Sequence, residues 1–428
     1  MKNALVLSFW FPPISGIGGI RAYGLAKYLP NYGWNAIILT QTLPGNPDPE
    51  LQVIQTPYID VVKKWKEWAG LDSKKTLNEQ FKVKTEKDAP SILDRLVALP
   101  SEIITYPDIA KGWYDFAIDA AEKIIETEDI GVIFSTSPPA TSNLIAKKLS
   151  EKHNIPWVAD FRDLWTQNHY YSYSPIRSYF DRRLEVKTLC HASAITTVSA
   201  PLAQKLAELH QNAQVFTIKN GFDPTLINDG NTVDPQFLIV HTGNLYHGKR
   251  DPQVLFDVLK DLLDSGLIER EDLNVGFYGY PPPGSHEKWL EQEIMKSSLE
   301  DCVTLHGEVP HTDSIAIQRK AQMLLLLTWN NPEEKGVYTG KLFEYLAARR
   351  PILSVGYEDG GVVKELLQET RSGVHPKNKD ELRTVILDAY QEYKTEGKVR
   401  YTGRDSEIMK YSHIEMAKQF SEIFTSVL

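Results

Sequence analysis

The sequence predicts an α/β protein with two domains, each built on a parallel β-sheet. Short apolar runs recur along the chain and are continuous rather than alternating, which is typical of strands covered on both faces. Amphipathic segments separate most of these runs, and strand–helix alternation of this kind predicts parallel sheets. The length of 428 residues is enough for two or three domains, each with its own core.

The first domain is expected over about residues 1–225. Its candidate strands are 4–9, 35–40, 131–137, 156–161, 193–199 and 214–220. The stretch 220–236 is polar and rich in Gly, Pro, Asp and Asn, which is typical of a linker. It separates the first series of strands from a second one.

The second domain is expected over about residues 226–404, followed by a helix over 405–428. Its candidate strands are 236–243, 274–279, 303–307, 322–328 and 351–356. Residues 41–111 are expected to interrupt the first domain, because they carry several prolines and a basic-aromatic stretch at 59–71. That stretch predicts either an interfacial helix that touches a membrane or the acceptor, or a helix that caps its own domain.

Composition excludes several classes of protein. A net charge of −9 argues against duplex nucleic acid as the main partner, because that affinity comes largely from Lys and Arg. The two cysteines, Cys190 and Cys302, cannot form a disulfide framework or a thiolate zinc site, so we expect reduced thiols in a cytosolic protein. No run of about 20 apolar residues predicts a membrane span, and no signal peptide is expected.

The stretch SGIGG at 15–19 follows the first strand and precedes a helix pattern. A dinucleotide fingerprint would need a third glycine where Arg21 stands and an acidic residue where Gln41 stands, so that interpretation is disfavoured. Gly18 and Gly19 still allow backbone N–H groups at a helix start to approach a phosphate. The alternative is that the glycines only form a tight turn.

Two clusters in the second domain carry charge at predicted strand and helix ends. Gly243 turns the chain after a strand, and Lys249 and Arg250 follow it, where open α/β sheets bind ligands. The alternative is a solvated basic loop. A second glycine pair follows the last predicted strand, within 356–367, with the same two interpretations as the first pair.

In the other cluster, Thr339 can cap a helix and Gly340 opens it. Lys341 and Glu344 are three positions apart, so they are neighbours on one helix face. The carboxylate can accept two ribose hydroxyls while the lysine faces phosphate. The alternative is a surface ion pair.

These motifs together resemble the nucleotide-sugar glycosyltransferases of family 4, of the bacterial surface-glycan type, which have the GT-B fold. The resemblance rests on a Phe-Pro-Pro turn before Gly18, on Gly243-x-Leu-x3-Lys249, and on Lys-Leu-x-Glu-Tyr-Leu-Ala from Lys341 followed by Pro-Ile-Leu. Further matching segments are 107–117, 134–142, 156–165 and 219–223. The resemblance covers nearly the whole chain outside 41–105.

The resemblance implies two Rossmann-like domains with parallel sheets that face each other across a cleft, the first for the acceptor and the second for the donor. The last helix would cross back to the first domain. Glu344 would bind the donor ribose, Lys249 and Lys341 the diphosphate, and the base would lie near Val309. Gly18 and Gly19 would approach the diphosphate or the donor sugar, with Asn244 and Arg250 as helpers.

The chain departs from the family pattern at two positions. Many members carry a Glu-x7-Glu pair, but the first Glu is replaced here by Gly336, which puts the donor sugar in doubt. Asn244 stands where an Arg is common, which removes one diphosphate cation.

No metal or cofactor is expected. The sequence has no Asp-x-Asp motif, and cations with helix ends can neutralise a leaving diphosphate instead. At the end of a first-domain strand, Arg162 could steady a phosphate or an acidic acceptor, and Asp163 could orient an acceptor hydroxyl. The alternative is an Arg–Asp pair that locks the two domains or a loop.

The sequence thus favours a retaining, metal-independent glycosyltransferase. Its co-substrate would be a UDP- or GDP-type nucleotide-diphosphate sugar, and its acceptor a glycan or a lipid-linked molecule. We expect a cytoplasmic protein, compatible with peripheral contact at the inner membrane face. The alternatives are a nucleotide-sugar 2-epimerase-like enzyme and an inactive, donor-binding partner subunit. The oligomeric state stays open.

Overall fold

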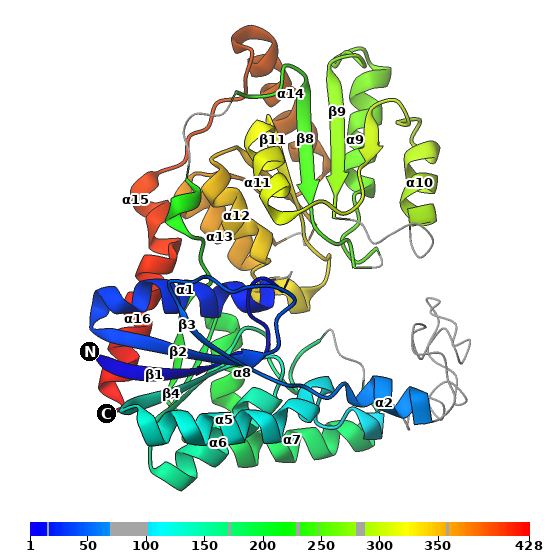
Figure 1. Cartoon of the computed structure of the whole chain (residues 1–428). Coiled ribbons are helices and arrows are strands. Elements are labelled where there is room, and N and C mark those ends of the chain that lie inside the picture. The colour runs from blue at the N-terminus through cyan, green and yellow to red at the C-terminus, as the bar shows by residue number, and fades with distance from the viewer. Residues whose placement is uncertain are drawn as a thin grey trace. The chain divides into compact units, whose positions relative to one another are not determined.

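The computed structural model describes residues 1–14, 17–68, 102–169, 173–227, 232–246, 248–279, 287–356 and 359–428. The chain forms two compact units (Figure 1). Unit 1 consists of Met1–Lys219 with Met416–Leu428, and unit 2 consists of Asn220–Glu415. Each unit contains one parallel sheet, which confirms the predicted fold class.

In unit 1 the strands are β1 (Lys2–Leu7), β2 (Trp34–Gln41), β3 (Gln52–Thr56), β4 (Ile130–Ser137), β5 (Trp157–Phe161), β6 (Ala194–Thr197) and β7 (Val215–Thr217). The helices are η1 (Ile17–Gly19), α1 (Ile20–Tyr28), η2 (Leu29–Tyr32), α2 (Val61–Trp68), η3 (Ile109–Trp113), α5 (Tyr114–Thr127), α6 (Thr141–His153), α7 (Pro175–Leu189), α8 (Ala200–Leu209) and the larger part of α16 (His413–Ser426).

In unit 2 the strands are β8 (Phe237–Thr242), β9 (Leu273–Tyr278), β10 (Val303–Leu305), β11 (Met323–Leu327), β12 (Ile352–Val355) and β13 (Gly373–Val374). The helices are η4 (Pro224–Leu226), α9 (Gln253–Asp264), α10 (Glu287–Lys296), α11 (His311–Lys320), η5 (Pro332–Gly336), α12 (Gly340–Ala348), α13 (Gly361–Thr370), α14 (Lys379–Glu396), α15 (Asp405–Ile408) and η6 (Met409–Tyr411).

Each predicted strand corresponds to a strand of the structure, but the sequence does not predict β3 and β13. Both are edge strands: β3 pairs in parallel with β2, and β13 with β12. Edge strands are short or partly polar because only one neighbour shields them. The expected interruption over 41–111 therefore does not hold for β3, which is part of the sheet.

The order of strands reverses once in each sheet. Unit 1 has the order β3-β2-β1-β4-β5-β6-β7, and unit 2 has the order β10-β9-β8-β11-β12-β13. The reversal lies between β1 and β4 in unit 1, and between β8 and β11 in unit 2. In open α/β sheets, ligands bind outside the carboxyl ends of the strands at such a reversal. We call the side on which the strands end the carboxyl edge.

The sheet of unit 1 is covered on both faces, which explains its continuous apolar strands. Leu5 and Ile133 belong to a core cluster with α5 and α6, while Phe134, the next residue on β4, contacts Phe420 and Phe424 of α16. Figure 1 shows α5, α6 and α7 on one side of this sheet and α1 and α16 on the other.

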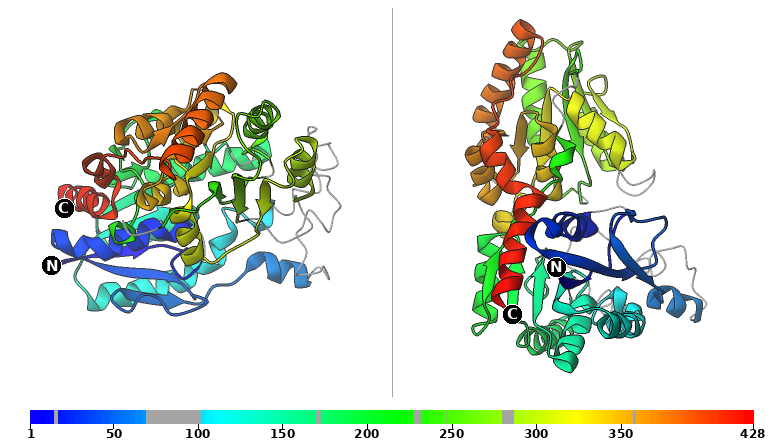
Figure 2. Two further views of the ribbon diagram at one scale, coloured as in Figure 1. Left: turned by 90° about the horizontal axis from the view of Figure 1, so that it is seen from above. Right: turned by 60° about the vertical axis from the view of Figure 1, so that its left-hand side comes forward.

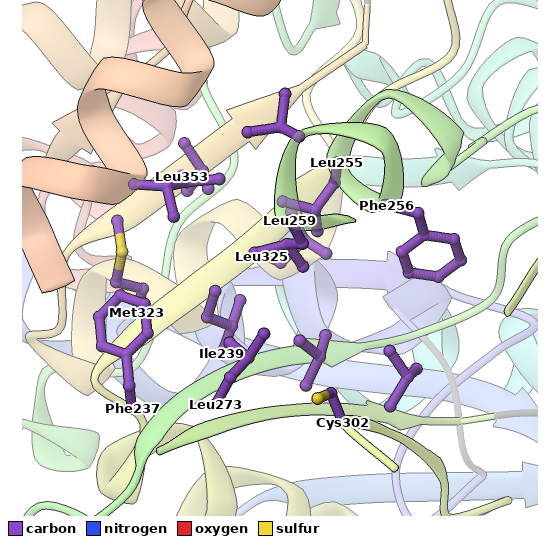
Figure 3. Close-up of a cluster of buried hydrophobic side chains, with 14 of the residues drawn as sticks. Phe237, Ile239, Leu255, Phe256, Leu259, Leu273, Cys302, Met323, Leu325 and Leu353 are labelled. Carbon is purple, nitrogen blue, oxygen red and sulfur yellow. The ribbon is translucent and has the colours of Figure 1, made fainter. Parts of the chain in front are cut away.

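The sheet of unit 2 is built in the same way. Ile239 and Leu325 face a cluster that includes α9, and both side chains lie in this cluster in Figure 3. Val240 and Leu324, one position along each strand, belong to a second cluster with α12 and α13. Successive residues of a strand point to opposite faces, so both faces are apolar.

The C-terminal segment is divided into α15, η6 and α16 rather than being the single helix expected over 405–428. Ser412 is extended between η6 and α16, and it pairs as a β-bridge with Phe222. Beyond Met416 the chain belongs to unit 1, where α16 lies along the sheet in both Figures 1 and 2. The contact between Ser412 and Phe222 thus separates η6 from α16.

A buried ion pair joins α1 to the middle of the first sheet. The Arg21 guanidinium donates to both carboxylate oxygens of Asp160 on β5, at 3.0 and 2.9 Å. It also donates to the carbonyls of Ile218 and Lys219 and lies over the ring of Phe420. Both charged side chains are almost inaccessible to water, so each depends on the other for its partners.

We predict that Asp160→Ala lowers the free energy of unfolding by about 3–5 kcal/mol, because it leaves the Arg21 charge buried without its carboxylate. Urea denaturation followed by circular dichroism measures the loss. Glu151→Ala is the matched control, since its partly exposed pair with Lys147 should contribute less than about 1 kcal/mol. Equal losses for the two variants would contradict this role of the buried pair.

Candidate functional site

The carboxyl edge of unit 2 gathers charged and polar residues at the reversal between β8 and β11. β8 ends at Thr242, and the chain turns at Gly243, whose φ of +133° favours glycine. The amide of Gly243 donates to the carbonyl of Tyr278 at the end of β9. α12 begins at Gly340, as predicted, and its first turn brings Lys341 and Glu344 to this edge.

Glu344 is the most constrained carboxylate of this edge. Its Oε2 accepts from Lys341 Nζ at 2.9 Å and from Gln318 Nε2 at 3.1 Å, and its Oε1 lies 3.4 Å from His311 Nε2. Burial alone would raise its pKa, but the hydrogen bond from His311 and the charge of Lys341 lower the pKa of Glu344 to about 2. The carboxylate is therefore ionised and acts only as an acceptor near neutral pH.

A buried polar network that the sequence does not reveal holds this carboxylate. Gln318 on α11 is fully buried and donates to Glu344 and to the Thr242 hydroxyl, the latter at 3.0 Å. Tyr345 accepts from the Thr242 amide at 2.9 Å and donates to the Leu325 carbonyl. Strands β8 and β11 are thus tied to the helix that carries Glu344.

Several buried polar atoms near this edge have no hydrogen-bond partner in the described part of the chain. They are Thr339 Oγ1, Gln318 Oε1, His241 Nε2 and Arg250 Nε. Burial lowers the pKa of His241 to about 4, so its ring is neutral at pH 7; Nδ1 faces the Leu325 carbonyl at 3.0 Å. Unpaired buried groups are rare, and a polar ligand would supply the partners they lack.

Thr339 does not cap α12 in the predicted way. It occupies the position before the helix with extended backbone angles, but its hydroxyl makes no capping hydrogen bond. The Thr339 hydroxyl therefore accepts from no amide of the first turn, and the Leu342 amide donates to the Thr339 carbonyl at 3.1 Å. The N–H groups at a helix start favour an anion.

Aromatic rings hold the two cations that follow β8. The Lys249 ammonium lies 4.5 Å from the ring centroid of Trp329, in the loop after β11. The Arg250 guanidinium lies 4.4 Å from the ring centroid of Tyr246. These cation–π contacts hold the two charged groups at the carboxyl edge of unit 2. Trp329 has no signal in the sequence that links it to Lys249.

Asn244 and Val309 take local positions in the same unit. The Asn244 side chain accepts from the Tyr246 amide at 2.6 Å and so shapes the turn after β8. Val309 is half-buried in the loop between β10 and α11. Next to this loop, the rings of His306 and Tyr278 stack in parallel with centroids 4.2 Å apart.

In unit 1 the glycine loop lies at the reversal between β1 and β4. Gly18 and Gly19 end η1, and α1 begins at Ile20. A side chain at Gly19 would come within 2.8 Å of the Phe11 backbone, and one at Gly18 within 2.8 Å of Arg162 Nη1. Close packing therefore requires both glycines, as the tight-turn interpretation expects.

Arg162 fastens this loop to the loop after β4. Its guanidinium donates to the carbonyls of Gly18 and Pro138, and Nε lies 3.4 Å from the Ser137 carbonyl. Asp163 is exposed directly after it, at the carboxyl edge of β5. Arg162 thus has a structural role in the described contacts, and its predicted contact with a phosphate or acceptor stays a prediction.

Two further properties concern metals and membranes. Among the described residues, no three His, Cys, Asp or Glu side chains gather so that they could hold a metal ion. No helix in the described ranges has the length and apolar character needed to cross a membrane.

Residues 18–226 match the family model described as Glycosyltransferase Family 4. No curated protein matches the chain.

Similar solved structures span the whole chain. Sucrose-phosphate synthase from Thermosynechococcus elongatus has a TM-score of 0.64 and 13% identity, over 100% of this chain and 99% of that one. Anabaena Alr3699/HepE in complex with UDP and glucose has a TM-score of 0.62 and 14% identity, over 100% of both chains. A Staphylococcus aureus TarM mutant in complex with fondaparinux, alpha-GlcNAc-glycerol and UDP has a TM-score of 0.59 and 10% identity, over 99% and 100%. These likenesses confirm the expected GT-B fold.

We predict that the ionised Glu344 stabilises the protein only while it stays deprotonated. Its folded-state pKa lies below the ordinary value of 4.5, so the contribution is complete above about pH 4.5 and is lost as the pH falls toward 2. The shift corresponds to roughly 3 kcal/mol. Denaturation of wild type and Glu344→Gln at pH 7 and pH 3 measures it.

The stability gap between these two proteins should shrink at pH 3. Glu365→Gln, at an exposed position on α13, is the control and should change little at either pH. A gap that is equally large at both pH values would show that Glu344 does not carry the lowered pKa.

Proposed function

We propose that this chain is a glycosyltransferase, because its residues 18–226 match the model of Glycosyltransferase Family 4 and its fold is GT-B. The chain transfers a sugar from a nucleotide-diphosphate sugar to a glycan or lipid-linked acceptor. The observation that carries the proposal is the ionised Glu344, held beside Lys341 at the carboxyl edge of unit 2.

The proposed donor site assigns one role to each group. The Glu344 carboxylate accepts the ribose hydroxyls, because it is ionised and a pure acceptor. Lys341 and Lys249 bind the diphosphate, helped by the N–H groups at Gly340. Arg250 adds a further charge at the same edge, and Asn244 shapes the turn that carries it.

We propose UDP as the nucleotide and the loop at Val309 as the site of the base. Alr3699/HepE was solved with UDP-glucose and the TarM mutant with UDP, which supports UDP over GDP as the first candidate. The stacked rings of His306 and Tyr278 adjoin this loop and offer a flat surface to a base.

The proposed chemistry is retaining and independent of metal. The leaving diphosphate would be stabilised by Lys249, Lys341 and the start of α12, which act as preorganised positive groups. Transfer in the presence of EDTA, with the anomeric configuration of the first product read by NMR, tests both points. Loss of activity in EDTA that Mg²⁺ restores would contradict metal independence.

For unit 1 we propose acceptor binding at its own carboxyl edge, with Asp163 orienting the acceptor hydroxyl. Arg162 would position the glycine loop, since its donors are used by backbone carbonyls. A lipid-linked acceptor would place the protein in the cytoplasm, in contact with the inner membrane face. Asp163→Asn should then lower transfer but leave UDP binding unchanged.

A second candidate is an inactive subunit that binds the donor. It is favoured by Gly336, which is buried in η5 where many members carry a glutamate that contacts the sugar. An assay of donor turnover with and without an acceptor separates the candidates. Turnover that needs an acceptor supports the transferase, turnover without one supports the epimerase-like enzyme, and UDP binding without any turnover supports the inactive subunit.

We predict that Glu344→Ala and Lys249→Met each weaken UDP binding by about 10- to 100-fold, because each removes a charge-assisted contact. Isothermal titration calorimetry with UDP measures the change. Glu365→Ala and Lys364→Met, which lie on the neighbouring helix α13, serve as matched controls. If all four variants bound UDP like the wild type, this site assignment would be wrong.

A further inference from the structure

Helix α7 has its polarity inverted relative to an ordinary surface helix. Its buried positions include Arg177, Asp181 and Glu185, which recur every four residues and form one face. Soluble proteins usually bury apolar residues on such a face and expose the charged ones. The inward face of α7 is therefore the polar one.

A dense set of polar contacts fixes this orientation. Arg177 Nε donates to Asp181 at 2.5 Å, and its other nitrogens donate to backbone carbonyls between residues 102 and 107. Glu185 accepts from the amide of Thr166 at 3.1 Å. If the helix rotated, these buried charged groups would lose their hydrogen-bond partners. The outer face therefore cannot turn inward.

The outer face carries large apolar side chains. Ile176 is 64% exposed, Tyr179 56% and Phe180 54%, and Val186 is also exposed farther along the helix. The rings of Tyr179 and Phe180 contact each other edge to face. Scattered exposed apolar residues are ordinary, but a helix face built from them marks an interaction surface.

The exposed charges of α7 are all positive. Arg182, Arg183 and Lys187 are exposed, whereas the two carboxylates of the helix, Asp181 and Glu185, are buried. The whole chain has a net charge of −9, so this basic and apolar face contrasts with the rest of the protein. Basic residues beside exposed aromatic and aliphatic residues are typical of helices that lie on anionic membranes.

We propose that the outer face of α7 docks on an anionic lipid bilayer surface, with Ile176, Tyr179 and Phe180 at the acyl boundary and Arg182, Arg183 and Lys187 at the headgroups. This docking surface extends the proposed transfer to a lipid-linked acceptor. The proposal rests on that proposed function only for the reason why the protein would bind a membrane. A second copy of the chain fits less well, because a symmetric contact would oppose the same arginines.

The stretch 59–71, which the sequence offers as an interfacial helix, stays a separate prediction, and its residues 69–71 lie outside the described part of the chain. In α2, within that stretch, Lys66 is buried and Trp68 is the large exposed side chain. α7 presents a longer apolar face, with basic residues along it.

The test is cosedimentation of the full chain with vesicles of phosphatidylcholine alone and with 30% phosphatidylglycerol. Wild type should bind the anionic vesicles, and added salt should weaken binding. The apolar variant Ile176→Ser/Phe180→Ser and the charge variant Arg182→Gln/Arg183→Gln should each bind at least roughly tenfold more weakly. Met295→Ser/Lys398→Gln, at exposed positions in unit 2, is the matched control and should bind like the wild type.

Three outcomes would overturn the proposal. In the first, wild type sediments equally with both vesicle types; in the second, both α7 variants bind like the wild type. In the third outcome, wild type forms a dimer in solution that the apolar variant dissociates, which would make α7 a protein interface. Titration with UDP separates this proposal from the proposed function. The α7 variants should bind UDP like the wild type. A wild type that binds anionic vesicles but does not bind UDP would refute the donor site and leave the membrane proposal intact.

Discussion

The structure of unit 1 depends on the buried pair of Arg21 and Asp160. The pair joins α1, which follows the glycine loop, to the interior strand β5. Arg21 also donates to the carbonyls directly after β7 and lies over the ring of Phe420 on α16. Hydroxyls of neighbouring strands complete the carboxylate: Asp160 accepts from Thr136 and Thr196. A charge buried in this way is tolerated only with all its partners present, so the arrangement of these elements is strongly specified.

Unit 2 also holds a buried carboxylate through several hydrogen bonds, at its carboxyl edge. Neutral side chains take the place that Arg21 has in unit 1. Gln318, Thr242 and Tyr345 link strands β8 and β11 to the helix that carries Glu344. The network fixes one carboxylate oxygen, while Lys341 supplies the charge that keeps it ionised. A carboxylate held in one orientation loses little entropy when it accepts two hydroxyls, which suits it to the proposed ribose contact.

Helix α7 shows that burial follows the available partners rather than residue type alone. Arg177 points inward because backbone carbonyls accept its hydrogen bonds, and Glu185 points inward because Thr166 donates to it. The large apolar residues of α7 then face outward. The proposed acceptor chemistry and this face fit one another: a lipid-linked acceptor lies at a membrane, and a basic apolar helix favours the same surface. The two proposals still rest on separate observations, one in each unit.

The sequence by itself determined the fold class, the positions of the long strands along the chain and the pairing of Lys341 with Glu344, because continuous apolar runs and helical spacing are local properties. Only the tertiary structure decided the rest. It added the edge strands β3 and β13, which are too short or too polar to be recognised, and divided the last helix at Ser412. It also showed that Arg162 serves the glycine loop and that Gln318 and Trp329 support the candidate site. These contacts join residues far apart in the chain, and no spacing rule encodes them.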